Sequence, residues 1–237
     1  MRLIILGIDA LDINMVSHLE LDVLKQAQYG ELKVPLSSVS GYPRSPSVWA
    51  SFLTGHEREI EFTRNCEGVN MFMGLDEKTF LDLDGVKGLN VPYHDYEIDT
   101  LTKLIRLRKK LRWWPWTMGK IVDIHNSRTI EIFNEVINSS GYRVLFAFIQ
   151  TLDTLNHILY LRPNIIKNAY RTMEIEFMNL KRKLGDDMII IVSDHGFQKN
   201  GFHSNTGFYS CNHVLDPKPN NITDFYGLVN AFLKGEK

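Results

Sequence analysis

Cysteine is scarce in this sequence, and so is an excess of charge of either sign. The chain has two cysteines, Cys66 and Cys211, which make neither a disulfide framework nor a C-x-x-C pair, so a reducing interior is the expected compartment. The formal net charge is −1 and the pI is near 6.7. This balance gives no reason to expect a surface that coats nucleic acid, and we predict no stable nucleic-acid partner.

Long hydrophobic runs are also missing. No stretch approaches the length of a membrane span, and the apolar run over 3–8 is too short for a signal peptide, lacks a small-residue cleavage site and ends at Asp9. We therefore expect a cytoplasmic protein with no membrane partner. The 237 residues suffice for one large domain, or for a domain with a small insertion.

Strand and helix patterns alternate along the chain. Apolar runs predict strands at 2–8, 31–34, 88–92, 143–149 and 188–193. Helical patterns occupy 13–27, 48–53, 101–111, 128–139, 163–184 and 224–233. This alternation predicts an α/β fold with a mostly parallel central sheet and helices on both faces. We expect a single catalytic domain over 1–237, in which the irregular stretch 57–125 is the candidate for a small cap or insertion.

The run from Met188 to Phe197 is the most informative segment. It reads as a strand buried on both faces that ends abruptly in Asp194, His195 and Gly196. In open α/β sheets, the carboxyl ends of such strands are where ligands and chemistry lie. A carboxylate beside an imidazole suits a divalent cation such as Zn or Mn.

Metal-type side chains follow two other predicted strands. Asp9 closes the first strand, while Asp153 and His157 follow the strand 143–149 at a spacing of four. On a helical turn, residues four apart project from one face and can share one cation. A second cation would be held by Asp9 with Asp194 and His195. Oxygen and imidazole ligands without thiolates fit a catalytic two-metal site better than a structural zinc.

A serine at a helix entrance would complete such a site. A metal lowers the pKa of the hydroxyl and makes it a nucleophile, and the amide groups of a helix N-terminus favour a phosphate there. Ser45 is the preferred candidate because it immediately precedes Pro46, which opens a helix. Ser47 is the second candidate.

Each of these residues also has an ordinary interpretation. Asp9 and Ser45 could each cap a following helix, Asp153 with His157 could be an exposed ion pair, and His203 could be a solvated loop residue. Their joint occurrence favours a site, because several strand ends or adjoining turns all present metal-type ligands in a chain with eight histidines.

Taken together, these segments resemble the alkaline phosphatase superfamily, and above all its type I phosphodiesterase and nucleotide pyrophosphatase branch, including related archaeal enzymes. That branch typically opens with an apolar strand that ends in a metal-binding Asp, which Asp9 matches. A nucleophilic Thr or Ser then precedes a pattern close to P-x-W-x-S-F-x-T-G. The segment from Ser45 to Gly55 resembles this pattern and places Ser45 at the nucleophile.

The remaining motifs follow in the same order. The D-x-x-x-H pair of the family corresponds to Asp153 and His157, and its S-D-H-G signature corresponds to 193–196. A last metal-binding histidine downstream would be His203, and 89–92 resembles a strand-and-proline segment of the prokaryotic relatives. The resemblance covers both ends and the middle of the chain.

The resemblance implies an alkaline-phosphatase-like three-layer sandwich with two divalent metal ions, Zn in the first place and Mn or Mg as alternatives. It assigns two sets of metal ligands: Asp153, His157 and His203 for the first metal, and Asp9, Asp194 and His195, with Ser45 in contact, for the second.

The sequence departs from the branch near the nucleophile. Serine stands where threonine is usual, although serine is chemically competent, and Pro43-Arg44 replaces a commoner small polar segment. The branch's phosphate-contacting Asn would be Asn65, although the residues between fit poorly.

The implied function is hydrolysis of phosphodiester or nucleotide pyrophosphate bonds through a phospho-serine, with a small phosphate ester or nucleotide as substrate. A phosphomonoesterase or a phosphonate or sulfate-ester hydrolase is the enzymatic alternative. A mutase of the phosphoglycerate type would need a large inserted domain for which the chain has little room. A metal-stabilised binding module without turnover is the non-enzymatic alternative. The oligomeric state is not indicated.

An aromatic cluster, Trp113-Trp114-Pro115-Trp116, follows the basic run 106–110. It resembles an interfacial patch, but we expect it to pack under a cap or at a subunit contact. A stacking platform for a nucleobase is a further alternative.

Overall fold

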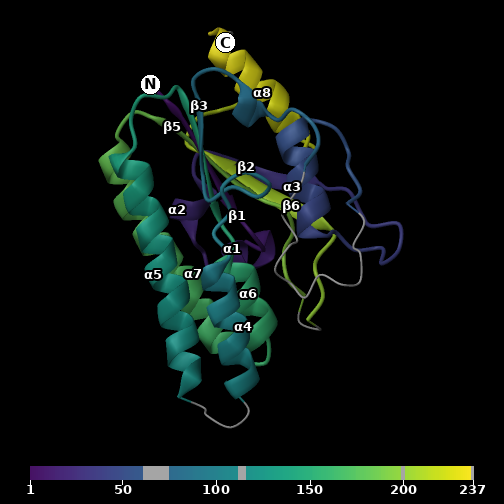
Figure 1. Cartoon of the computed structure of the whole chain (residues 1–237). Helices are drawn as coiled ribbons and strands as arrows, with labels where there is room; N and C mark the ends of the chain where they lie inside the picture. The colour runs from purple at the N-terminus through teal and green to yellow at the C-terminus, as the bar shows by residue number, and fades with distance from the viewer. Residues whose placement is uncertain (61–74, 112–115, 199–200, 236–237) are drawn as a thin grey trace.

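The computed structural model describes residues 1–60, 75–111, 116–198 and 201–235 (Figure 1). Its centre is a six-stranded sheet in the order β2-β6-β5-β1-β4-β3. The strands are β1 Leu3–Ile8, β2 Gln28–Lys33, β3 Val86–Leu89, β4 Val144–Ile149, β5 Met188–Ser193 and β6 Thr206–Cys211. The strands β3, β4, β1 and β5 run parallel, whereas β6 is antiparallel to both β5 and β2. The predicted mostly parallel α/β sheet is confirmed.

Helices cover both faces of this sheet (Figure 1). They are α1 Ile13–His18, α2 Asp22–Lys25, α3 Ser45–Thr54, the 3-10 turn η1 Phe80–Asp82, α4 Asp99–Leu111, α5 Thr117–Asn138, α6 Thr151–Leu159, α7 Pro163–Leu184 and α8 Asp224–Lys234. Helices α3 and α8 with η1 pack on one face, and α1, α2 and α4 to α7 pack on the other.

The alternation of side chains along β1 explains the two layers. Leu3 and Ile5 belong to the core beneath α3 and α8, whereas Ile4, Leu6 and Ile8 belong to the core beneath the other helices. Successive residues of a strand point to opposite faces, so a continuous apolar run is what a strand covered on both sides requires. The same alternation holds for β4 and β5. These three strands are neighbours in the middle of the sheet and are buried on both faces.

Two helix predictions need correction. The pattern over 13–27 is divided into α1 and α2, because Glu20 adopts φ 55°, a left-handed conformation that an α-helix does not accommodate. The helix predicted near 128–139 begins earlier, at Thr117. The buried stripe of its first half includes the polar residues Thr117 and His125, which hid the apolar periodicity there.

Strand β6 was not predicted. Its residues Thr206–Cys211 include Gly207 and Ser210, both buried, so the segment lacks the run of apolar and β-branched residues that marks a strand. Its place comes from pairing with β5 on one side and β2 on the other. Strand β2 is also longer than the predicted 31–34, because that pairing begins at Gln28.

No helix in the described parts of the chain is both long enough and apolar enough to span a membrane.

Candidate metal centre

The predicted site residues come together at one edge of the sheet. Strands β4, β1 and β5 are neighbours and run parallel, so their carboxyl ends share an edge. Asp9 follows β1, Asp153 lies in the first turn of α6 after β4, and Asp194 and His195 follow β5. All four are buried.

Ser45 lies between the ends of β1 and β5. Its Oγ is 3.0 Å from His195 Nε2 and 3.3 Å from Asp9 Oδ1. His195 Nε2 is in turn 3.2 Å from Asp194 Oδ2 and 3.5 Å from Asp9 Oδ1. The four side chains predicted for the second metal therefore form one contact group.

A second group forms beside it. Asp153 Oδ1 lies 3.4 Å from His157 Nε2 and 3.8 Å from His203 Nε2, and the two Nε2 atoms are 3.0 Å apart. The ring of His203 also stacks on that of His195, with centroids 3.7 Å apart. The loop that carries His203 thus joins the two groups.

Two of the imidazoles are oriented by backbone carbonyls. His195 Nδ1 lies 3.0 Å from the carbonyl oxygen of Gly196, and His203 Nδ1 lies 3.0 Å from that of Pro43. When Nδ1 donates its proton to a carbonyl, Nε2 keeps a lone pair for a metal. Both Nε2 atoms face the carboxylates.

The electrostatics of the site call for a cation. Burial raises the pKa of Asp153 to about 7, and burial together with the neighbouring carboxylates of Asp194 and Asp153 holds the pKa of Asp9 well above its ordinary value. Burial likewise raises the pKa of Asp194 and lowers that of His195 to about 3. A cluster of buried carboxylates with neutral imidazoles is stabilised by a bound metal ion.

Unsatisfied oxygen atoms support the same conclusion. Asp9 Oδ2, Asp153 Oδ1 and Asp194 Oδ2 are buried and accept no hydrogen bond from any residue that the structure describes. Buried polar atoms are normally hydrogen-bonded, and an ion is one explanation for an exception. The structure contains two sets of possible metal ligands, and within each set the donor atoms all lie within 4.8 Å of one another. The first set is Asp153, His157 and His203, and the second is Asp9, Asp153 and His195. The residues present therefore fit divalent cations.

The second set differs in one respect from the predicted ligands. Asp153 joins Asp9 and His195 in it, whereas Asp194 was expected there. Asp194 is still next to the group, because its Oδ2 lies 3.2 Å from His195 Nε2 while its Oδ1 accepts the amide of Ala10. Asp153 lies within reach of both sets.

Asp9, Ser45 and Asp153 do not have the helix-capping and surface ion-pair roles that were their ordinary interpretations. The N-cap of α1 is Asp12, not Asp9, and Ser45 is the first residue of α3 rather than its cap. Asp153 is 9% exposed, which is too little for a surface ion pair. Ser47 is turned to a structural contact, because its Oγ accepts the amide of Ile60.

Buried polar contacts hold the loops around the site in place. Tyr170 accepts the amide of Asp12 and donates to the carbonyl of Ala10, which fixes the turn after Asp9. Asp12 Oδ1 accepts the amide of Asn14, and its Oδ2 accepts the amide of Phe197. The turns that follow β1 and β5 are thereby tied together.

A pocket of about 550 Å³ opens onto Ser45, Asp153, His157 and His203. Its wall includes residues that sequence reasoning did not assign to the site: Arg44, Leu101, Ile105, Arg108 and Gln150. Gln150 accepts a hydrogen bond from Tyr96. The one signal in the sequence for a positively charged side chain in the pocket wall was Arg44, which directly precedes Ser45.

Two features that the sequence singled out, Asn65 and Trp113–Pro115, lie outside the described residues.

His125 gives a test of the packing beneath α6. Its Nδ1 pairs with Thr151 Oγ1 at 2.8 Å at the start of α6, and burial lowers its pKa to about 4. A pKa lowered by folding contributes stability above pH 6.5 that is lost as the pH falls towards 4. We expect the stability difference between wild type and His125→Leu to shrink by up to about 3 kcal/mol over that range, as measured by urea unfolding. If the free energies of unfolding of wild type and His125→Leu kept the same difference from pH 6.5 to pH 4, the lowered pKa of His125 would be contradicted.

Known structures share this architecture. A Mg-bound mutant of TAB5 alkaline phosphatase, from an Antarctic bacterium, matches with a TM-score of 0.58 and 10% identity, covering 98% of this chain and 97% of that one. Ps i-CgsB in complex with k-i-k-neocarrahexaose matches with a TM-score of 0.57 and 13% identity, covering 100% of this chain and 72% of that one. The PH0037 protein of Pyrococcus horikoshii matches with a TM-score of 0.52 and 10% identity over 100% and 97%.

No protein-family model matches the sequence, and no curated protein sequence matches it. At about one residue in ten identical, the structural matches establish the arrangement of the chain. The chain therefore has the fold of alkaline phosphatase, as its ordered motifs predicted.

Proposed function

We propose that this chain is a metal-dependent hydrolase of the alkaline phosphatase superfamily that cleaves phosphodiester or nucleotide pyrophosphate bonds through a phospho-serine. The observation that carries the proposal is the place of Ser45, which lines the pocket and whose Oγ lies 3.0 Å from His195 Nε2 and 3.3 Å from Asp9 Oδ1. Asp153, His157 and His203 would hold one cation, and Asp9, Asp194 and His195 the other. Zn is the first choice, and Mn or Mg the second.

When bound, the two cations would lower the pKa of the Ser45 hydroxyl and of a water molecule, and would balance the charge of the phosphoryl oxygens. Ser45 Oγ attacks phosphorus from the first turn of α3, whose amide groups favour a bound phosphate. A bond from phosphorus to Ser45 Oγ forms as the bond to the leaving group breaks. Water then attacks the phosphorus of this serine-linked ester, which breaks its bond to Ser45 Oγ, releases the remaining phosphate monoester and returns a proton to the hydroxyl.

The walls of the pocket indicate how a substrate would be selected. Arg44 and Arg108 supply positive charge for phosphate oxygens, while Leu101 and Ile105 of α4 form an apolar side that fits the organic part of an ester. In this proposal residues 1–237 act as one catalytic domain. The segment 57–125 selects the substrate, because α4 belongs to it.

The proposal is tested with metal-free protein and three substrates: bis-nitrophenyl phosphate, nitrophenyl phosphate and a nitrophenyl nucleotide ester. We expect chelated, dialysed protein to be inactive, and Zn, Mn or Mg to restore hydrolysis, with the diester and the nucleotide ester ahead of the monoester. Full activity after chelation would refute the two-metal account. Zn binding without turnover of any of the three would favour the binding-module alternative, and fastest cleavage of the monoester would favour a phosphomonoesterase.

A further inference from the structure

Positive charge is concentrated in one segment of this nearly neutral chain. Between Thr100 and Val122 there are seven lysine and arginine residues and no acidic residue, although the net charge of the whole chain is −1. A block of like charge of this kind is typical of a surface that meets a partner of opposite charge.

The described residues of this segment lie on α4 and at the start of α5, two helices that form a hairpin. Helices α4 and α5 pack against each other and extend beyond the carboxyl edge of the sheet (Figure 1). The apolar residues Leu101 and Leu104 of α4 are buried, whereas Arg106, Lys109 and Lys110 are exposed. The basic side chains therefore cover the outer side of the hairpin near its end.

An exposed tryptophan accompanies these charges. The side chain of Trp116, just before α5, is 57% exposed, and Lys120 Nζ lies 4.5 Å from the centre of its ring. The sequence predicted that the tryptophan cluster packs under a cap or at a subunit contact. The exposure of Trp116, the member of the cluster that the structure describes, does not fit packing under a cap, and the subunit contact stays a prediction.

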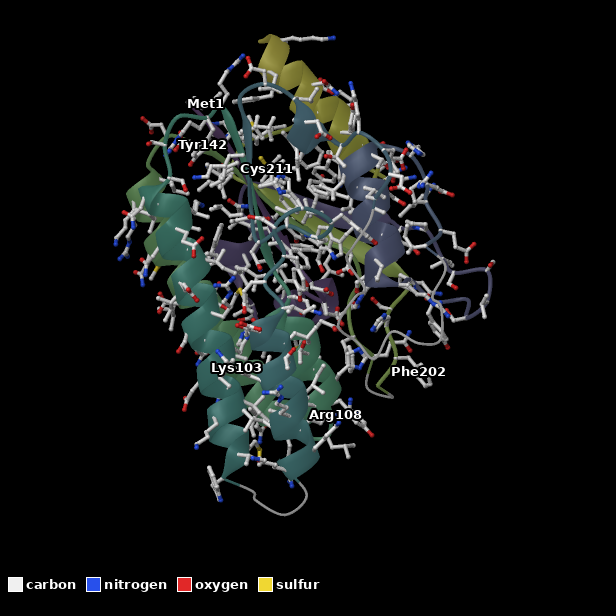
Figure 2. All side chains as sticks on the ribbon, viewed as in Figure 1. Met1, Lys103, Arg108, Tyr142, Phe202 and Cys211 are labelled. Atoms are coloured by element: carbon white, nitrogen blue, oxygen red, sulfur yellow. The ribbon has the colours of Figure 1, made fainter. Side chains whose placement is uncertain are left out.

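The pocket opens at the same end of the molecule. Arg108 of α4, His203 and Ile158 line it together. Phe202, next to His203 in the chain, is 54% exposed, and Leu161, three residues after Ile158, is 72% exposed. Figure 2 shows Arg108 and Phe202 at the end opposite Met1 and Tyr142. The pocket wall thus includes a residue of the basic hairpin, and exposed apolar residues lie close in the chain to residues that line it.

We propose that this end of the molecule docks on an anionic membrane surface. The docking face consists of Arg106, Lys109, Lys110, Trp116 and Lys120. Basic side chains are attracted to the negative surface potential of anionic lipids, and tryptophan favours the boundary between headgroups and acyl chains. The protein lies on the surface in this proposal, with its pocket turned towards the headgroups.

The apolar side chains around the pocket favour a membrane over a nucleic acid. Phosphates of either partner would attract the basic residues, and Trp116 could stack on a base. An exposed aliphatic side chain such as that of Leu161 has no ring that could stack on a nucleobase, but it can enter the headgroup region of a bilayer. A lipid surface accounts for both kinds of side chain.

The test is co-sedimentation of the full chain with vesicles of phosphatidylcholine, alone or mixed with phosphatidylglycerol. We expect binding to the anionic vesicles only, weakening as salt shortens the range of electrostatic attraction. The triple variant Arg106→Gln, Lys109→Gln, Lys110→Gln should bind at least about tenfold more weakly. Trp116→Ala should weaken the binding that persists at high salt.

The matched control removes three charges at the other end of the molecule. Lys181, Arg182 and Lys183 lie in the last turn of α7, shortly before Asp187, which pairs with Arg2. Their replacement by glutamine should leave vesicle binding unchanged, and thermal melting shows whether both triple variants are folded. Equal binding to both kinds of vesicle, or equal losses in the two variants, would overturn the proposal. Binding to single-stranded DNA without binding to vesicles would make a nucleic acid the partner instead.

Discussion

Ser45→Ala is expected to lower kcat on nitrophenyl phosphate esters by on the order of a thousandfold or more, because the substitution removes the nucleophile itself. The hydroxyl is lost from a position 3.0 Å from His195 Nε2 and 3.3 Å from Asp9 Oδ1. Its removal leaves the carboxylates and imidazoles in place, so the variant should still bind Zn. The measurement is steady-state hydrolysis by protein whose metal content has been determined.

Ser47→Ala is the matched control. The Ser47 hydroxyl is just as buried in the same helix, but it accepts the amide of Ile60. We expect Ser47→Ala to lose about 1 kcal/mol of stability and to keep kcat within a few fold. Equal hydrolysis by wild type and Ser45→Ala would remove Ser45 as the nucleophile, and loss of turnover in Ser47→Ala alone would assign that role to Ser47.

The sheet and the strand-end residues could be predicted for the same reason. A strand buried on both faces needs a continuous apolar run, so β1, β4 and β5 are legible in the sequence, and the residues at their carboxyl ends are found with them. Parallel neighbours end at one edge, which is enough to expect Asp9 near Asp194. Residues brought in by loops depended on the order of the motifs, as with His203.

Other features depend on contacts that no local pattern records. Asp153 lies near both sets of donor atoms because α6 begins directly at the end of β4, and spacing alone paired it only with His157. Arg108 and Ile105 belong to a helix with an ordinary basic pattern, and their place in the pocket wall follows from how α4 packs against α6. Strand β6 is specified by pairing rather than by its own composition.

Asp9→Asn is expected to have opposite effects in the absence and presence of metal. Folding raises the pKa of Asp9 through burial first, and then through the carboxylates of Asp194 and Asp153. A carboxyl whose pKa is raised contributes stability below its ordinary pKa that is lost as the pH rises through the folded value. At pH 8, metal-free Asp9→Asn should therefore be more stable than metal-free wild type, and this advantage should shrink towards pH 4.

Zinc should reverse the order of stability. A cation that binds only the folded state adds about 2.7 kcal/mol at a free concentration a hundred times its Kd, and the Asp9→Asn variant, which lacks the carboxylate, would forfeit most of that gain at the second metal. Asp12→Asn is the control, because Asp12 is also buried but accepts the amides of Asn14 and Phe197. It should be destabilised with and without zinc and should keep the full response to it. Urea unfolding in the presence of a chelator, and again with zinc, gives the free energy of unfolding of each protein. If metal-free Asp9→Asn were less stable than metal-free wild type, and zinc stabilised both equally, Asp9 would have a structural role and no part in a metal centre.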